Sequence, residues 1–79
     1  MQLININEEI TGDVFIKRNT QYNDLKAENV IVYENVTTRI FGTITGLLTL
    51  KKGSIVYLHG IMYGSMHNEG GELHIFNKE

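Results

Sequence analysis

Apolar residues recur along this chain with a period of about 18 residues from position 28 onward, which is the kind of self-similarity that marks a repeat architecture. The repeated units read ENVIVYENVTTRIFGTIT (28–45), GLLTLKKGSIVYLHGIMY (46–63) and GSMHNEGGELHIFNKE (64–79). The columns that stay apolar hold Val30, Leu48 and Met66; Val32 and Leu50; and Ile40, Leu58 and, one residue early, Ile75. A unit this short cannot bury a core alone, so consecutive units must stack on one another. The period therefore predicts a β-solenoid.

Alternation within the units indicates which side chains face the interior. Ile40, Gly42 and Ile44 share one face, because successive side chains of a strand point to opposite sides. The next unit repeats this order with Leu58, Gly60 and Met62. Glycine between inward apolar residues indicates a tight corner or a narrow interior.

The first third of the chain follows the period less closely. Residues 2–6 alternate as in a short strand, and residues 12–16 resemble the opening of the unit at 46–50. Residues 17–27 are polar, and a loop, one helical turn or a degenerate rung all remain open. Terminal repeats are atypical because they shield the end of the stack. We therefore expect residues 1–27 to form a cap and an imperfect first rung, and residues 28–79 to form the repeat rungs.

The predicted fold class is thus all-β: a small single-domain parallel β-solenoid of about three to four rungs with an irregular N-terminal cap. Seventy-nine residues allow one domain, spanning 1–79. A chain of this length buries only about 60% of its unfolded surface, and it has no cysteine to form a disulfide. The composition predicts that association supplements its stability, with a partner or as a homo-oligomer.

Charge and hydropathy narrow the classes of partner. Seven basic and nine acidic residues give a net charge of −2, and the basic pairs Lys17-Arg18 and Lys51-Lys52 are separate. Nucleic-acid binding needs clustered cations, so none is expected. The N-terminus lacks the features of a signal peptide, and no apolar run approaches the ~20 residues that span a bilayer. The expectation is a cytoplasmic protein with no membrane contact, in which the sequon at Asn35 has no role.

Residues that carry chemistry are few. The histidines are His59, His67 and His74, and no metal-binding spacing such as H-E-x-x-H surrounds them. Ser54 and Ser65 adjoin glycines without forming a nucleophile elbow, and no phosphate-binding glycine pattern is present. We predict no catalytic residues, no metal site, no cofactor and no enzymatic activity.

The outward columns are more informative than the core, because they carry aromatic and apolar residues where a solvated strand normally carries Thr, Lys, Glu or Ser. Contiguous exposed apolar residues usually mark a contact surface. Two alternatives stay open: residues 1–27 fold back over this surface, or the rings only stack from rung to rung. The predicted partner-binding residues are Arg39, Phe41, Tyr57, His59, Ile61, Tyr63, His74 and Phe76.

The unit G-x-L-x-L-x-x-G-x-x-V-x-L-x-G, seen from Gly46 to Gly60, and the closing GGELHIF (70–76) resemble the triangular β-solenoid of bactofilins and related polymer-forming proteins. The resemblance covers roughly residues 28–76 and implies the fold and the capacity to self-assemble. The hexapeptide-repeat acyltransferases are set aside, because the units lack an inner period of six.

Two functions follow as expectations. The first is a non-catalytic protein-binding module, a small inhibitor or immunity-type protein that neutralises a toxin or enzyme through the aromatic strand face. The alternative is a self-assembling bactofilin-like scaffold. A third and weaker interpretation is a domain that holds a sugar or another small ligand on the aromatic face.

Overall fold

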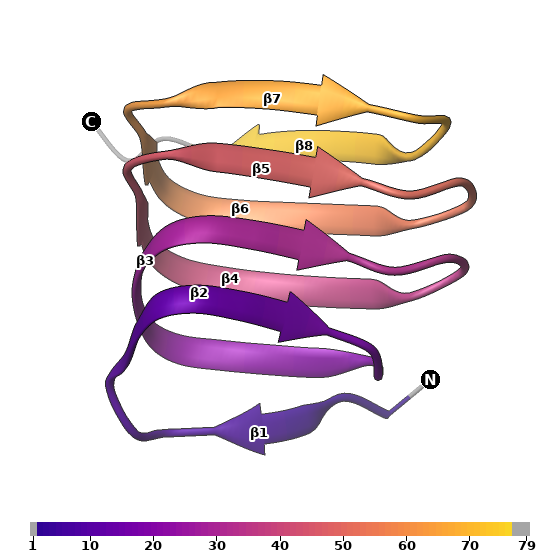
Figure 1. Ribbon diagram of the computed structural model, residues 1–79. Helices are drawn as coiled ribbons and strands as arrows, with labels where there is room; N and C mark the ends of the chain where they lie inside the picture. The colour runs from indigo at the N-terminus through magenta and orange to yellow at the C-terminus, as the bar shows by residue number, and fades with distance from the viewer. Residues whose placement is uncertain (1, 77–79) are drawn as a thin grey trace.

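The computed structural model describes residues 2–76, which wind into a parallel β-solenoid of about four turns (Figure 1). The predicted all-β solenoid is confirmed. The strands are β1 (Ile4–Ile6), β2 (Ile10–Ile16), β3 (Thr20–Val32), β4 (Thr37–Ile44), β5 (Leu47–Leu50), β6 (Ile55–Met62), β7 (Ser65–Asn68) and β8 (Glu72–Phe76). Residues 2–76 contain no helix long and apolar enough to cross a bilayer.

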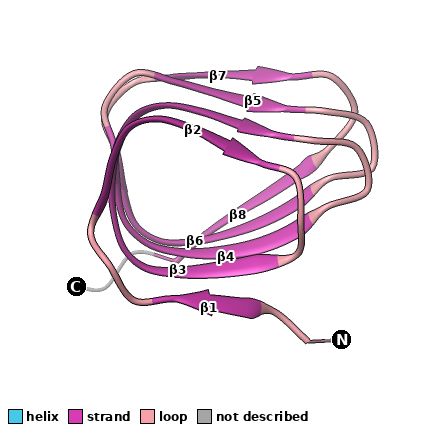
Figure 2. Cartoon of the chain, turned by 60° about the horizontal axis from the view of Figure 1, so that its bottom comes forward, coloured by secondary structure: helices cyan, strands magenta, loops and turns pink. Residues whose placement is uncertain are grey.

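The repeat unit of the sequence corresponds to one coil of the solenoid. Strand β4 pairs with β6 in parallel from Thr37↔Ile55 to Ile44↔Met62, so every residue of β4 lies beside its equivalent in the next unit. Strands β5 and β7 keep the same separation along the chain, whereas the coil that joins β6 to β8 is one residue shorter. This shorter coil explains why Ile75 is one residue early in the sequence alignment. Figure 2 shows the coils superposed when viewed nearly along the axis.

The first coil is shorter than the others, which is why the period fades toward the N-terminus. Ile4 pairs with Thr20 and Ile10 with Leu25, so these partners are closer along the chain than those of the later coils. The register also shifts at Gly12/Asp13 on β2 and between Tyr22 and Leu25 on β3. Of the three conformations left open for residues 17–27, the structure has a rung from Thr20 onward, because β3 pairs with β1 and β2 on one side and with β4 and β5 on the other.

The core consists of the inward columns, in the register predicted from the repeat. Val30 pairs with Leu48 and Leu48 with Met66, while Ile40 pairs with Leu58 and Leu58 with Ile75. Each side chain therefore packs on its equivalents in the neighbouring coils. The side chains buried most completely are those of Ile16, Leu25, Val30, Val32, Ile40, Ile44, Leu48, Leu50, Val56 and Leu58.

One inward column contains two buried threonines, Thr20 and Thr38, whose hydroxyl groups both donate hydrogen bonds. Thr38 is fully buried, and its Oγ1 donates a hydrogen bond of 2.7 Å to the Thr20 carbonyl oxygen in the coil below. Burying a hydroxyl without a partner is unfavourable, so this bond is what allows a threonine in the core. Within the described residues no fully buried side-chain nitrogen or oxygen lacks a partner.

At Gly42 and Gly60 the neighbouring coil leaves no room for a side chain. A Cβ built on Gly60 would overlap the carbonyl oxygen of Gly42, and one built on Gly42 would overlap that of Leu25. Gly42 also has φ of +153°, a conformation that side chains disfavour. The inference that these glycines mark a tight corner agrees with this geometry.

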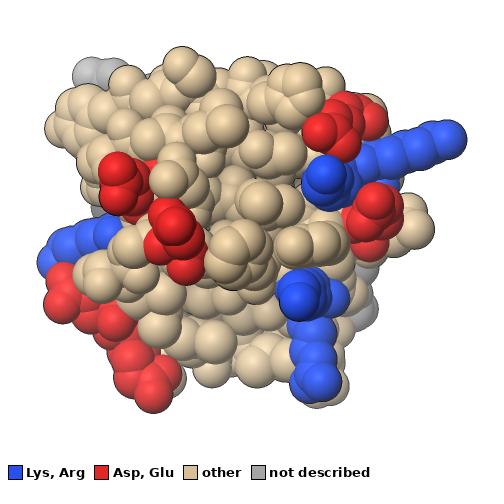
Figure 3. Space-filling view, viewed as in Figure 1, with Lys and Arg blue, Asp and Glu red and all other residues tan. Residues whose placement is uncertain are grey.

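Charged side chains lie along the edges of the side of the molecule seen in Figure 3, and the surface between them is uncharged. One contact between coils is an ion pair, in which Lys51 Nζ lies 3.4 Å from Glu69 Oε1. An exposed pair of this kind contributes little, about 0–1 kcal/mol. The viewed side therefore presents no continuous basic surface.

Candidate protein-interaction face

The eight predicted partner-binding residues occupy outward positions on β4, β6, β8 and the corner that follows β6. The register places them in the columns expected from the repeat. Arg39 pairs with Tyr57 and Tyr57 with His74, and Phe41 pairs with His59 and His59 with Phe76. We call the eight together the aromatic face. Its members are Arg39, Phe41, Tyr57, His59, Ile61, Tyr63, His74 and Phe76.

Five of these side chains form two stacks of rings that run across the strands. The Phe41 and His59 rings lie 4.7 Å apart between centroids, and His59 and Phe76 are also 4.7 Å apart. Tyr57 and His74 stack at 5.2 Å, and Tyr57 joins the other stack through Phe76 at 6.4 Å. The spacing matches the ~4.8 Å between hydrogen-bonded strands, so the backbone register itself sets the distance between rings.

Within these stacks the faces of the rings are turned toward one another. The interplanar angles are 16° for Phe41 with His59 and 12° for His59 with Phe76, so His59 has an aromatic neighbour on each face. Stacked aromatic pairs contribute about 0.5–1.5 kcal/mol beyond their buried area. A partner would therefore contact mainly the edges of these rings. Stacking already restricts the rotamers of their side chains.

Three members of the face lie outside the ring stacks. Arg39 is exposed at the start of the Tyr57 column, and Ile61 pairs with Thr43 on β4. Ile61 is 49% exposed and Tyr63 is 70% exposed. The structure thus brings five of the eight predicted residues into direct ring contact. Arg39 lies at one end of the Tyr57 column, and Ile61 and Tyr63 follow the Gly60 corner.

The N-terminal third does not cover the aromatic face. Residues 2–27 contain β1, β2 and the first half of β3. These strands form the end of the solenoid opposite β7 and β8, where β3 pairs with β4 (Figure 1). Phe41 and Phe76 remain 36% and 48% exposed. The alternative in which residues 1–27 fold over this face is therefore wrong for the described residues 2–27.

Toward β1 the same outward columns change from rings to amides, which sequence reasoning did not detect. Asn5 pairs with Gln21 and Gln21 with Arg39. Gln21 Nε2 donates to Asn23 Oδ1 at 2.9 Å, and Asn23 Nδ2 donates to Asn7 Oδ1 at 2.6 Å. The shorter first coil hides this alignment in the sequence. The result is a ladder of hydrogen-bonded amides beside the aromatic face.

Titratable groups on and near the face form pairs rather than clusters. His74 Nε2 lies 3.2 Å from Glu72 Oε1, and on another strand His67 Nε2 lies 3.2 Å from Glu69 Oε2. Among residues 2–76 no three metal-ligating side chains come together. These groups can make polar contacts with a partner. The predicted lack of catalysis stays a prediction.

One lysine with a perturbed pKa, Lys26, lies in the outward column of Ile61, because Lys26 pairs with Thr43 and Thr43 with Ile61. Lys26 donates a hydrogen bond to Glu9, and this bond, with the negative charges of Asp24 and Glu9, raises the pKa of the Lys26 ammonium. The ammonium is exposed, and its raised pKa keeps it charged at neutral pH. It therefore belongs to a surface ion pair rather than to a reactive site.

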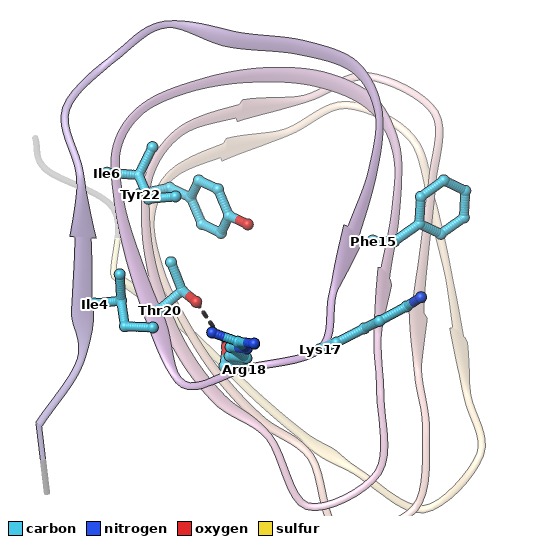
Figure 4. A pocket seen from close by; sticks show the side chains of 7 residues that line it. All are labelled: Ile4, Ile6, Phe15, Lys17, Arg18, Thr20 and Tyr22. Atoms are coloured by element: carbon cyan, nitrogen blue, oxygen red, sulfur yellow. Dashed lines mark hydrogen bonds between the residues drawn. The ribbon is translucent and has the colours of Figure 1, made fainter.

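A second feature, missed in the sequence, is a hollow at the β1 end of the solenoid (Figure 4). Sequence reasoning treated most of its lining as an irregular stretch, although the basic pair next to a buried strand was visible there. It is lined by Ile4, Ile6, Phe15, Lys17, Arg18, Thr20 and Tyr22.

Comparison with known proteins yields no relative: no protein-family model, no curated protein and no solved structure matches the chain.

Proposed function

We propose that the protein is a non-catalytic binding module that contacts a protein partner through the aromatic face. The observation that carries the proposal is the pair of ordered ring stacks that residues 2–27 leave uncovered. A small rigid module of this kind suits an inhibitor or immunity-type protein, which neutralises a toxin or enzyme by covering its active site. The partner is accordingly a folded protein.

Preorganisation supports this role. Binding immobilises side chains at a cost of about 0.5–1.5 kcal/mol for each flexible one. The stacked rings of Phe41, His59 and Phe76 are held before any partner arrives, so this cost is largely avoided. Tyrosine and arginine are also enriched among the residues that dominate binding energy, and the face contains Tyr57, Tyr63 and Arg39.

The surroundings of the face match the anatomy of protein interfaces, in which an apolar centre is bordered by a polar rim. The amide ladder of Asn7, Gln21 and Asn23 borders it on the β1 side. A standard interface buries about 800 Å² on each partner. The described protein has 4887 Å² of accessible surface, so such an interface would occupy roughly one side of the solenoid.

Ladder stacking alone does not account for the composition of the face. Stabilisation by ring stacking requires contacts between rings, which are made by Phe41, Tyr57, His59, His74 and Phe76. Among residues 2–76, the Tyr63 ring stacks on no other ring, and both Ile61 and Tyr63 remain exposed. Binding of a sugar within the ring stacks is less favoured, because Phe41 and Phe76 occupy both faces of His59. The exposed ring of Tyr63 lies outside these stacks.

The test is capture of a partner from the native host. We expect the tagged protein to retain one dominant heterologous protein, and the double variant Tyr57→Ala with Phe76→Ala to lose it by at least about a hundredfold in affinity, because two central aromatic contacts are removed. Isothermal titration of the purified pair measures this loss. A matched control, Phe15→Ala with Leu47→Ala, removes exposed apolar groups from β2 and β5 and should bind normally.

The stability of each variant must be measured alongside binding. The double variant removes three stacked pairs, so it is expected to lose about 1.5–4.5 kcal/mol and to remain folded by circular dichroism. If a partner binds both double variants equally well, or if no protein is retained by the folded wild type, the aromatic face is not the binding surface.

A self-assembling scaffold is the second candidate, and one observation favours it. In the sheet of residues 2–76, β1, β2, β7 and β8 each pair along one edge only. Ile75 on β8 and Met66 on β7 are 47% and 45% exposed beside these edges. Unpaired strand edges are templates for pairing with another chain.

Sedimentation velocity distinguishes the two candidates. The binding module predicts a monomer or a closed dimer over a hundredfold range of concentration. The scaffold predicts species that grow with concentration, and an Ile75→Lys variant, which places a charge beside the β8 edge, should abolish that growth. Growth that is unaffected by this charge would count against assembly through β8.

A further inference from the structure

The hollow at the β1 end has a volume of about 350 Å³. Figure 4 shows Ile4 and Ile6 on one side of the opening, Phe15 and Lys17 on the opposite side, and Arg18 beside Thr20 at its edge. Ligand sites in proteins are usually concave, mostly apolar and supplied with a few polar groups. The lining of this hollow likewise combines apolar side chains with a few polar and charged groups.

The apolar part of the lining is exposed more than a core residue would be. Ile4 is 49% exposed and Phe15 is 56% exposed, whereas Tyr22 fills the mouth of the coil and is only 7% exposed. Covering apolar side chains stabilises by about 25 cal/mol per Å². A ligand whose apolar group covers Ile4 and Ile6 would gain this free energy on binding.

The charged part of the lining is entirely basic. Lys17 and Arg18 line the hollow, and no acidic residue between positions 2 and 76 does. The Lys17 ammonium lies 5.5 Å from the centre of the Tyr33 ring, so it is engaged in a cation–π contact just beyond the end of β3. Arg18 forms no ion pair with any residue between 2 and 76. Its guanidinium is the group available to an anion.

Two hydroxyl groups complete the lining. Thr20 Oγ1 donates a hydrogen bond of 2.7 Å to the Arg18 carbonyl oxygen, which holds the turn that carries the guanidinium. The Tyr22 hydroxyl points toward the middle of the coil in Figure 4 and has no hydrogen-bond partner among the described residues. Burial raises the pKa of the Tyr22 phenol, so at neutral pH it keeps its proton and can donate.

From this juxtaposition we infer that the hollow binds a small amphipathic monocarboxylate, an anion with a short acyl chain or a single ring. Its carboxylate accepts hydrogen bonds from Arg18 and from the Tyr22 hydroxyl, and its apolar group lies against Ile4 and Ile6. Charge complementarity selects the anion, and the apolar wall selects against small hydrated ions. The site is separate from the aromatic face, so it does not depend on the proposed function.

Titration with hexanoate, followed by two-dimensional amide NMR, tests the inference. We expect saturable shifts confined to residues 4–6 and 15–22. Hexanol, which has the same chain without the charge, should bind at least about tenfold more weakly, because charge-assisted hydrogen bonds are lost. Hexylamine, which carries the opposite charge, should not bind there.

The variant Arg18→Gln should weaken hexanoate binding by about tenfold or more. Arg18 is exposed, so the fold should persist, and Lys52→Gln, at an exposed turn away from the hollow, is the matched control. Tyr22→Phe should weaken binding to a smaller extent. Absence of saturation, equal binding of hexanol, or unchanged binding by Arg18→Gln would each overturn the inference.

Discussion

Replacing Gly60 by alanine is expected to destabilise the protein by about 3 kcal/mol or more, a large part of the stability of a domain this small. The new methyl group would overlap the carbonyl oxygen of Gly42 on the neighbouring strand. That oxygen belongs to a backbone held by the β4–β6 ladder, in which Gly42 pairs with Gly60. Relief therefore requires the two strands to separate locally, and a side-chain rotation cannot provide it.

Gly12→Ala is the matched control for this substitution. Gly12 has φ of +81°, and nothing lies within 4 Å of the position that its Cβ would take. Only the conformational penalty applies there, about 1–2 kcal/mol. Urea denaturation of both variants measures the difference in free energy of unfolding. If Gly60→Ala costs no more than Gly12→Ala, the close approach of the coils does not constrain the fold.

Ile40→Ala is expected to cost about 3–4 kcal/mol. Ile40 is fully buried, and it lies between Tyr22 in the coil below and Leu58 in the coil above. The ladders on both sides of β4 hold the backbone in place, so the surrounding residues cannot collapse into the space left by the side chain. The destabilisation then includes both the lost free energy of burying the side chain and the cost of the cavity that it leaves.

Ile61→Ala makes the same chemical change on an outward position. Ile61 is 49% exposed, so the change in free energy of unfolding should stay within about 0.5 kcal/mol. Thermal or urea denaturation of the two variants compares an inward with an outward position of the β4–β6 ladder. If the two variants lose the same free energy of unfolding, the assignment of Ile40 to the inside and Ile61 to the outside is wrong.

Much of this architecture is predictable from the chain because a solenoid repeats one local pattern. The columns of Ile40, Leu58 and Ile75 are visible as a period, including the coil that is one residue short. The first coil cannot be recognised in the same way. Its shorter length and the irregularities at Gly12 and after Tyr22 displace the apolar positions, so residues 17–27 have no clear pattern although β3 passes through them.

The aromatic face was predictable as a set of outward residues, but its properties were not. Alternation places Phe41, His59 and Phe76 on the outside, yet it does not say whether their rings lie flat on the surface or stack. Stacking depends on coils being one strand spacing apart, which is a property of the assembled sheet. The amide ladder of Asn7 and Asn23 likewise depends on a register that the period does not reveal.

The sequence by itself determined the coil length, the inward columns and the candidate face, because these follow from side-chain alternation and from a repeat that must stack to bury its core. Only the tertiary structure decided three other features. These are the path of residues 2–27, which leave the face uncovered; the orientation of its rings; and the hollow beside Arg18 and Tyr22. Each depends on contacts between coils whose spacing in the sequence is irregular or whose geometry is set by the sheet.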